Sequence, residues 1–357
     1  MRLIVQPDDG VAPLLELIKG AKESMHLAIF RFDHGDVEKA LKGAMANGVK
    51  INTLIANVNR GGEKNLRNLE MRFLEAGMTV SRSGDDLIRH HDKIMIADQS
   101  RLGVLSFNFT HQDIEQSRGF GIITEDPKWV AEGIALFEAD CKRVPYTCES
   151  DTFVVSPVNA RKVLGNFLQD ARKQLLIYDP QISDKRMIRI LKDRIKAGVE
   201  LRVIGQTKFD VELRQLSKMR LHTRTIIRDG EQAFIGSQSL RGNELDARRE
   251  VGVIVREAPI VKKLAETFES DWASGTAEEE APDAESKEPE TPEPDTEKAL
   301  EVLVKELQPI TITVKKAVTK VVAQAGEEVL EDGIVKEAVK KVVKKVVKQA
   351  VKEAIRA

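Results

Sequence analysis

The sequence predicts an α/β fold made of two similar repeats, and two observations support this prediction. Apolar strands alternate with amphipathic helices along the first 275 residues, an order typical of mostly parallel sheets flanked by helices. Three segments also recur 150 positions further along the chain, namely 3–7 at 153–157, 21–29 at 171–179, and 48–51 at 198–201. We therefore expect repeats at residues 1–150 and 151–275, related by a pseudo-twofold axis, with the active site between them.

Each element of the repeat follows from a local pattern. The apolar run at residues 3–7 predicts a strand, and Gly48 marks the end of a helix ahead of a further strand at 51–55. Two helices are expected between these strands from apolar residues at helical spacing, namely Leu14, Leu15, Leu17 and Ile18 in the first and Val37, Ala40, Leu41 and Ala44 in the second. The second repeat has the same order, with Gly198 ahead of a strand at 201–204.

Charge divides the 357-residue chain into three parts. The whole chain carries 56 basic and 57 acidic residues, for a formal net charge of -1. Residues 1–275 have a net charge of +3, residues 276–298 of -8, and residues 299–357 of +4. The middle part also holds four prolines and lacks apolar periodicity, which predicts a disordered acidic linker.

The last part, residues 299–357, is expected to be a basic, Lys/Val-rich helical tail. In residues 335–357, apolar pairs recur every four residues with lysines between them. A period of four drifts around a helix of about 3.6 residues per turn, so the apolar stripe is amphipathic only over short stretches. Three interpretations stay open: a solvated or self-associating helix, peripheral contact with an anionic membrane surface, and contact with nucleic acid.

The sequence also predicts the compartment. It has no recognisable secretion signal and no apolar run of the length that a membrane helix needs. Its cysteines are Cys141 and Cys148, which we expect to be free thiols in a reducing environment. The expected location is therefore cytoplasmic. The membrane interpretation of the tail would add peripheral contact with the inner face of the membrane.

Each repeat carries the same chemical motif in its second half. The first repeat contains His91-Asp-Lys93, and the second contains His222-Thr-Arg224. Residues i and i+2 of a strand project from the same face, so each imidazole should lie beside a cation. Pairing the two repeats would bring both motifs to one cavity.

A hairpin is predicted after each motif. Asp98 and Asp229 are expected at its turn as structural residues far from the imidazoles. The return strands would bring hydroxyl and amide groups beside the histidines as substrate-binding residues, namely Ser106 and Asn108 in the first repeat and Ser237 and Ser239 in the second.

Two imidazoles and two cations around one cavity suit a displacement reaction at an anion, most simply a phosphodiester. A neutral imidazole can attack phosphorus while a protonated imidazole gives its proton to the leaving oxygen. Lys93 and Arg224 would offset the charge of the non-bridging oxygens. The six histidines show no spacing with Cys, Asp or Glu that indicates a metal site, so we expect neither a metal nor a cofactor.

These motifs resemble those of the phospholipase D superfamily, whose signature is His-x-Lys-x4-Asp with a downstream Gly-Ser-x-Asn, usually present twice. The resemblance covers residues 1–275. It implies a covalent phosphohistidine intermediate that water or an alcohol resolves, with His91 as the nucleophile and His222 as the general acid. Members of the superfamily include phospholipases, phospholipid synthases and nucleases.

The sequence departs from this signature at several positions. Arg224 replaces the second lysine, Ser239 replaces the second asparagine, and Leu105 interrupts the first Gly-Ser pair. A glutamate that orients a histidine in the family is matched by Glu250 in the second repeat but by Gly119 in the first. We therefore expect the first repeat to lack this support.

Other polar residues have structural interpretations beside functional ones. Arg118 and Arg249 precede equivalent strands and are either ion-pair partners or phosphate contacts. His90 is expected to point away from the cavity, and His26 to be partly buried structure. His111 is expected in a loop, with substrate contact as the less favoured interpretation.

The leading functional hypothesis is a phospholipase D-type phosphodiesterase that hydrolyses or transfers phospholipid headgroups. The basic tail and an aromatic content of 4% favour lipid over nucleic acid, because few rings are present to stack on bases. A phospholipase D-like nuclease is the alternative enzyme, although a net charge of +3 on the body does not indicate a long basic groove. Arg224, Ser239 and Gly119 motivate a third hypothesis, a degenerate phosphate-binding or scaffolding protein without catalysis.

Overall fold

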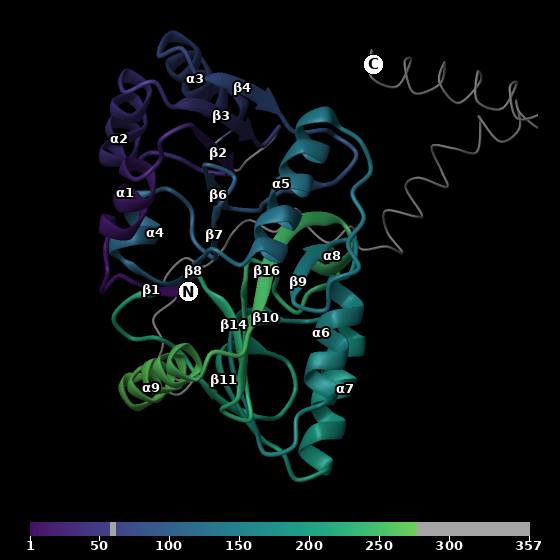
Figure 1. The fold of residues 1–357 in the computed structure, drawn as a ribbon. Helices are drawn as coiled ribbons and strands as arrows, with labels where there is room; N and C mark the ends of the chain where they lie inside the picture. Colours follow the sequence, from purple (N-terminus) through teal and green to yellow (C-terminus); the bar gives the residue numbers. More distant parts are fainter. Residues whose placement is uncertain (58–61, 277–357) are drawn as a thin grey trace, which may run out of the picture. The chain divides into compact units, whose positions relative to one another are not determined.

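The structure is a computed structural model that describes residues 1–57 and 62–276 (Figure 1). These residues belong to one unit of the chain. The predicted linker beyond Thr276 and the predicted tail at 299–357, with its repetitive 335–357 portion, lie outside the described residues.

Strands and helices alternate along the described chain. The strands are β1 (Arg2–Gln6), β2 (Ser24–Ile29), β3 (Lys50–Ile55), β4 (Thr79–Arg82), β5 (Arg89–His90), β6 (Ile94–Ala97), β7 (Arg101–Leu105), β8 (Ser117–Thr124), β9 (Phe153–Ser156), β10 (Gln174–Ile182), β11 (Glu200–Thr207), β12 (Glu212–Arg214), β13 (Arg220–Leu221), β14 (Arg224–Arg228), β15 (Gln232–Gly236) and β16 (Arg248–Val255). The helices are α1 (Ala12–Lys19), α2 (Gly35–Ala46), α3 (Gly62–Glu75), α4 (His111–Glu115), α5 (Pro127–Lys142), α6 (Ala160–Gln169), α7 (Lys185–Lys196), α8 (Gly242–Asp246) and α9 (Ala258–Ser274).

Each repeat builds a sheet with the same order of strands. The first sheet runs β1-β8-β7-β6-β2-β3-β4, and the second runs β12-β11-β10-β14-β15-β16-β5, with β9 also paired to β16. Strands joined through a helix, such as β2 with β3 and β10 with β11, are parallel. The hairpins β6–β7 and β14–β15 are antiparallel, because a short turn reverses the chain. The predicted α/β class is confirmed, and the sheets are mixed rather than mostly parallel.

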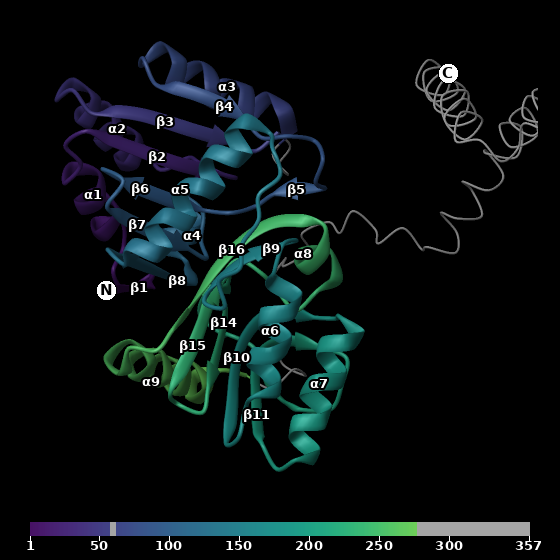
Figure 2. The same ribbon diagram turned by 45° about the vertical axis from the view of Figure 1, so that its right-hand side comes forward.

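A short strand from each repeat joins the sheet of the other repeat. β5, which precedes the first histidine motif, pairs with β16 and sets His90 opposite Arg249. β13, which precedes the second motif, pairs with β8 and sets Leu221 opposite Arg118. Figures 1 and 2 both show β8 and β16 at the junction of the two sheets. Each histidine motif therefore begins on the sheet of the other repeat.

Three apolar clusters form the core of the described chain. One packs α1, α2 and α3 on the first sheet and includes Leu14 and Phe73. Its counterpart packs α6 and α7 on the second sheet and includes Leu164. The third cluster contains residues of both repeats. The second repeat contributes Tyr178 and Phe268, and the first contributes residues of α5. Burial of this shared cluster holds the two sheets together.

Two buried ion pairs also cross between the repeats. Arg118 on β8 donates to both carboxylate oxygens of Asp271 on α9, at 2.7 and 2.9 Å. Arg249 on β16 donates in the same way to Asp140 on α5, at 3.0 and 2.9 Å. All four side chains are buried. The structure therefore places both arginines in structural ion pairs.

The described residues contain no helix that is long and apolar enough to cross a membrane. Both cysteines are free thiols, as the sequence indicated. Cys141 lies near the end of α5, and Cys148 lies in the segment that leads to β9.

Candidate active site

The two histidine motifs are anchored at the junction of the repeats. His91 donates its backbone N–H to the carbonyl oxygen of Arg249 at 2.8 Å, and His222 donates to that of Arg118 at 3.1 Å. His91 lies between β5 and β6, and His222 lies between β13 and β14, so neither is inside a strand. The neighbouring sheet thus anchors the backbone of each histidine, whereas strand spacing had predicted a histidine inside a strand.

Glu250 on β16 contacts the histidine of the other repeat. Its Oε2 lies 2.8 Å from His91 Nδ1, and both side chains are buried. The expectation that the first motif lacks a carboxylate is therefore wrong. The expectation failed because β5 and β13 each pair with the sheet of the other repeat, which places His91 beside β16. Burial raises the pKa of Glu250, against the opposing charges of Lys93, Arg248 and Arg224.

Gly119 occupies the position of this glutamate in the first repeat because Phe107 fills the space beside it. A Cβ atom at residue 119 would lie 2.9 Å from Phe107 Cδ1, closer than such atoms pack. Phe107 is fully buried, and the second repeat has Gln238 at the matching position. The two halves of the site are therefore unequal. The second repeat supplies Glu250, whereas at the matching position the first repeat has Gly119 packed against Phe107.

Lys93 lies against His91, as the spacing of the motif predicted. Its Nζ lies 3.0 Å from His91 Nδ1 and donates a hydrogen bond to the backbone carbonyl oxygen of that histidine. Burial lowers the pKa of Lys93 to about 7, despite the opposing charge of Glu250. The ring of Phe30 packs edge-on against the imidazole, with 4.5 Å between centroids. This ring shields the first motif from water.

His222 is buried, and its Nδ1 makes no hydrogen bond with the described residues. Asp113 Oδ2 lies 3.5 Å from this nitrogen. Burial lowers the pKa of His222 well below its usual value, and the positive charges of Arg220, Arg224 and Lys93 lower it further. His222 is therefore neutral near pH 7 when no substrate is bound.

Arg224 and Ser239 depart from the signature together. Arg224 Nε donates to Ser239 Oγ at 3.3 Å, and Nη1 donates to the carbonyl oxygen of His222 at 2.8 Å. The matching pair in the first repeat is Lys93 and Asn108. The shorter serine leaves room for the bulkier guanidinium, so the two substitutions form one compensated change.

The remaining predicted substrate-binding residues make hydrogen bonds to neighbouring backbone or side-chain groups of the protein. Asn108 Nδ2 donates to Asp113 Oδ2 at 2.7 Å. Ser106 Oγ accepts a backbone N–H of β8 at 2.9 Å, and Ser237 Oγ accepts one of β16 at 3.2 Å. Direct contact of these side chains and Ser239 with substrate remains a prediction.

Asp98 and Asp229 occupy the turns of the two hairpins. Both have a left-handed backbone, with φ of 51° and 57°. Asp98 accepts the backbone N–H groups of residues 22–24, and Asp229 accepts those of residues 172–174. Each aspartate therefore ties its hairpin to the start of a neighbouring strand, which is the structural position expected from the sequence.

A family model described as "Cardiolipin synthase, PLD-like domain" matches residues 14–141 and 205–272, more than half of the chain. The chain belongs to the phospholipase D superfamily. Both histidine motifs of this phospholipase D-like body lie within the matched residues. A search of the curated proteins found no match.

Two solved structures share the fold of the phospholipase D-like body, and a third shows a lower similarity. Polyphosphate kinase from Porphyromonas gingivalis has a TM-score of 0.64 and 18% identity, over 76% of this chain and 50% of that chain. The present chain thus spans about half the length of that protein. Phosphatidylserine synthase from Haemophilus influenzae Rd KW20 has a TM-score of 0.61 and 8% identity, over 77% and 86%. Nuc from Salmonella typhimurium, a phospholipase D family member, has a TM-score of 0.36 and 22% identity, over 39% and 91%.

Sequence reasoning missed several acidic residues of the phospholipase D-like site and its frame. Asp113 and Glu244 lie 131 positions apart, as do Asp140 and Asp271. This offset also relates the two histidine motifs, so extending the repeat comparison would have found all four residues. Phe30 gave no such signal, because the second repeat has a proline at the matching position.

Further arginines extend the positive charge of the phospholipase D-like site. Arg31 and Arg89 lie 5.6 and 5.4 Å from the centroid of the Phe30 ring. Arg220 donates to Asp113, the carboxylate beside the second motif. These three arginines are only partly buried. They suit a substrate that carries negative charge.

The other histidines are not part of the two motifs. His26 is partly buried, with its Nδ1 3.3 Å from Asn52 Nδ2, which matches its expected structural role. His90 is buried, with its Nδ1 3.8 Å from Asp140. His111 is half-exposed and is the first residue of α4, so the expectation that it lies in a loop is wrong.

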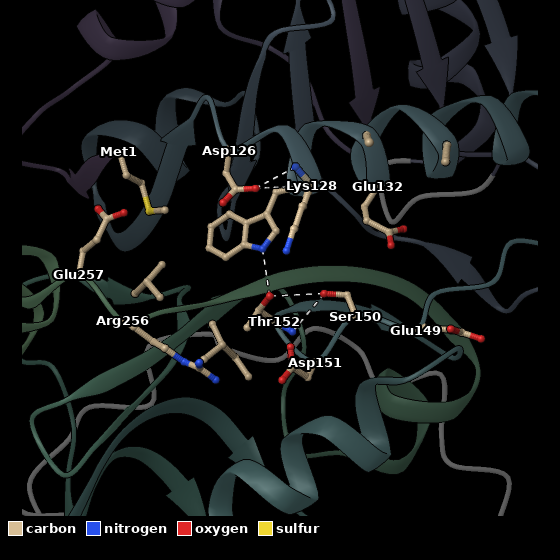
Figure 3. A pocket seen from close by; sticks show the side chains of 15 residues that line it. Met1, Asp126, Lys128, Glu132, Glu149, Ser150, Asp151, Thr152, Arg256 and Glu257 are labelled. Carbon is tan, nitrogen blue, oxygen red and sulfur yellow. Dashed lines mark hydrogen bonds between the residues drawn. The ribbon is translucent and has the colours of Figure 1, made fainter.

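A cavity of about 960 Å³ lies at the N-terminal end of α5 (Figure 3). Its lining includes neither histidine motif. Carboxylates outnumber cations around it, and Figure 3 shows Asp126, Glu132, Asp151 and Glu257 among them. Such a lining suits an anionic phosphodiester poorly, so we do not assign the reaction to this cavity.

Proposed function

We propose that the chain is a phospholipase D-type phosphodiesterase that hydrolyses or transfers phospholipid headgroups through a covalent phosphohistidine. One observation carries this proposal: the two buried His-x-Lys/Arg motifs are anchored on each other's repeat and differ in their hydrogen bonds. His91 has Glu250 at its Nδ1, whereas His222 has no hydrogen bond there. Membership of the superfamily supports phosphodiester chemistry.

His91 is the proposed nucleophile. An ionised Glu250 accepts the Nδ1–H, which leaves the lone pair of the imidazole on Nε2. Nε2 attacks phosphorus, so a P–N bond forms while the P–O bond to the leaving group breaks. Lys93 and Arg224 stabilise the charge on the non-bridging oxygens.

His222 is the proposed general acid. It is neutral in the free protein, partly because Arg220, Arg224 and Lys93 surround it. A bound phosphate brings negative charge that offsets these cations, which raises the pKa of His222 and lets it take up a proton. His222 gives this proton to the leaving oxygen. It then removes a proton from water or an alcohol, whose oxygen attacks phosphorus and releases His91.

Two features support a lipid substrate. None of the large hydrophobic side chains exposed on the described residues is aromatic, so that surface offers little for stacking bases. Arg31 and Arg89 near the first motif suit a headgroup with a second negative charge. The predicted basic tail at 335–357 supports a cytoplasmic protein that binds the inner face of the membrane, with the phospholipid as its partner.

The experiment that tests this proposal traps the intermediate. The full chain is mixed briefly with vesicles of ³²P-labelled cardiolipin, whose headgroup carries a second phosphate, or with ³²P-labelled single-stranded DNA. It is then denatured at alkaline pH, where phosphohistidine survives. We expect the lipid to label the wild type, His222→Ala to hold the label, and His91→Ala to remain unlabelled. His26→Gln is the matched control and should label like the wild type.

The outcomes separate the competing functions. Labelling by DNA alone would replace the lipid proposal with a nuclease. No labelling by either substrate, together with phosphate binding, would favour the degenerate phosphate-binding protein. Labelling of His91→Ala but not of His222→Ala would reverse the two roles. Vesicle flotation of the full chain and of a chain ending at Gly275 tests the tail, and equal flotation would contradict membrane contact through it.

A further inference from the structure

Three side chains near the start of α2 and along α4 meet outside the phospholipase D-like site. His34 is the N-cap residue of α2, and His111 and Glu115 are the first and last residues of α4. Glu115 Oε1 lies 2.8 Å from His111 Nδ1 and 3.5 Å from His34 Nε2. The two imidazole rings are stacked, with 4.1 Å between centroids. One ligand atom from each residue lies within 4.8 Å of the others.

His34 makes this cluster unusual. Its side chain is 2% exposed, and neither ring nitrogen makes a hydrogen bond with the described residues. A buried polar group without a partner is unfavourable, because it loses its hydrogen bonds to water and gains none in return. The Nε2 atom faces the carboxylate of Glu115, so a bound ion would supply the missing partner.

The second repeat fills the equivalent place with a cation of its own. Asp184 is the N-cap residue of α7, as His34 is of α2. Arg161 bridges Asp184 and Asp246, with hydrogen bonds of 2.8 Å and 2.7 Å. In the first repeat, Val11 stands where Arg161 stands in the second, so this cation is absent from the cluster.

We propose that His34, His111 and Glu115 bind one zinc-class divalent ion. Two imidazole nitrogens and one carboxylate oxygen are a ligand set that Zn²⁺ takes in tetrahedral geometry, with water as the fourth ligand. The nitrogen ligands disfavour Mg²⁺ and Ca²⁺, which prefer oxygen. His111 and Glu115 are each about half-exposed, which lets the ion enter and lets both side chains rotate toward it.

The ion would hold α4 against the start of α2. Asp33 and His34 already donate backbone N–H groups to the carbonyl oxygen of Phe109, at 3.0 and 3.2 Å. α4 also carries Asp113, which lies beside His222. The ion would therefore stabilise the position of α4, and with it that of Asp113 beside His222. This inference does not rest on the proposed function.

Cobalt(II) and zinc(II) titrations of the chelator-treated full chain test the proposal. We expect one Co²⁺ per chain with the visible absorption bands of a tetrahedral site, displacement by Zn²⁺, and a higher unfolding temperature in Zn²⁺. His111→Ala and Glu115→Gln change partly exposed residues and should fold; each should weaken binding by at least roughly tenfold and lose the temperature shift. His34→Asn should do the same.

A Cys141→Ser/Cys148→Ser chain is the matched control, because cysteine thiolates also bind zinc well. This chain should bind like the wild type. Absence of tetrahedral cobalt bands in the wild type would overturn the proposal. It would also be overturned if both His111→Ala and Glu115→Gln bound Co²⁺ with wild-type affinity. The same holds if the cysteine variant lost Co²⁺ binding while the His111 and Glu115 variants kept it.

Discussion

The two repeats share one architecture but give their histidines different surroundings. His91 has a carboxylate at Nδ1 and a lysine beside it. His222 has an arginine beside it and no hydrogen bond at Nδ1 within the described chain. The difference arises at residue 119, where Phe107 fills the space that Glu250 uses in the other half.

The proposed reaction is asymmetrical, although the two repeats around it share one architecture. A displacement through a covalent intermediate needs one nucleophile and one acid, which require opposite proton states at the start of the reaction. A carboxylate within hydrogen-bond distance of His91, 2.8 Å against 3.5 Å at His222, is enough to distinguish them.

Replacing Glu250 should have the largest effect on the reaction. Glu250→Gln keeps the shape of the side chain but no longer fixes the proton on His91 Nδ1. We expect phosphohistidine formation to slow by about 10²- to 10⁴-fold, measured by single-turnover labelling. Asp113→Asn, next to His222, should instead slow release of the label more than its formation. If Glu250→Gln labels at the wild-type rate and only releases slowly, the assignment of roles is wrong.

The crossed ion pairs should contribute equally to both halves of the frame. Asp271→Asn removes the buried anion of Arg118, which keeps only the exposed Asp8 at 3.4 Å, and Asp140→Asn removes the buried anion of Arg249. Each change should reduce the free energy of unfolding by about 3–5 kcal/mol in urea titrations. Glu138→Gln, which breaks an exposed pair with Lys142, is the control and should cost less than about 1 kcal/mol. A reduced free energy of unfolding in only one of the two variants would show that the two ion pairs do not contribute equally to stability.

The space beside Gly119 should be intolerant of a side chain. Gly119→Ala forces a Cβ against Phe107, and we expect a loss of about 1–3 kcal/mol in the free energy of unfolding. Gly43→Ala is the control, because that glycine lies in α2 with nothing near its Cβ position. This control should be neutral or slightly stabilising, since alanine favours helix. Equal urea midpoints for the two variants would refute the packing explanation.

The buried state of His222 should appear in the pH dependence of stability. Its pKa in the folded protein is lowered, so between that pKa and about 6.5 the unfolded chain binds a proton that the folded chain does not. Stability therefore falls as pH falls below 6.5, by at most about 1.4 kcal/mol per pH unit from this residue. His222→Asn should flatten the fall, measured by urea titrations between pH 7.5 and 5.5 with chelator present.

His111 is the control of opposite sign, because its hydrogen bond with Glu115 raises its pKa. His111 adds stability when it is protonated, and this contribution is lost as pH rises. His111→Asn should therefore make the fall toward low pH steeper. An unchanged pH profile in His222→Asn would mean that the residue is not buried as a neutral imidazole.

The sequence predicted the repeats, both motifs and the hairpin turns, because these depend on local periodicity and spacing. It did not predict that Glu250 reaches His91, since that contact depends on β5 and β13 crossing to opposite sheets. The mixed pairing of the sheets was missed for a related reason: the predicted hairpins add antiparallel pairs, and so do strands distant in the chain, such as β1 with β8 and β2 with β6, which local patterns do not reveal.

The ion pairs that cross between Arg118 and Asp271 and between Arg249 and Asp140 also restrict how the chain can change over time. A substitution at any of these positions in one half is compensated only by a substitution in the other half. Neither copy of the duplicated unit can therefore diverge alone at these sites. Among relatives, residues 118 and 271 should therefore change together, as should residues 140 and 249. The sequence of one half at these positions would then predict that of the other.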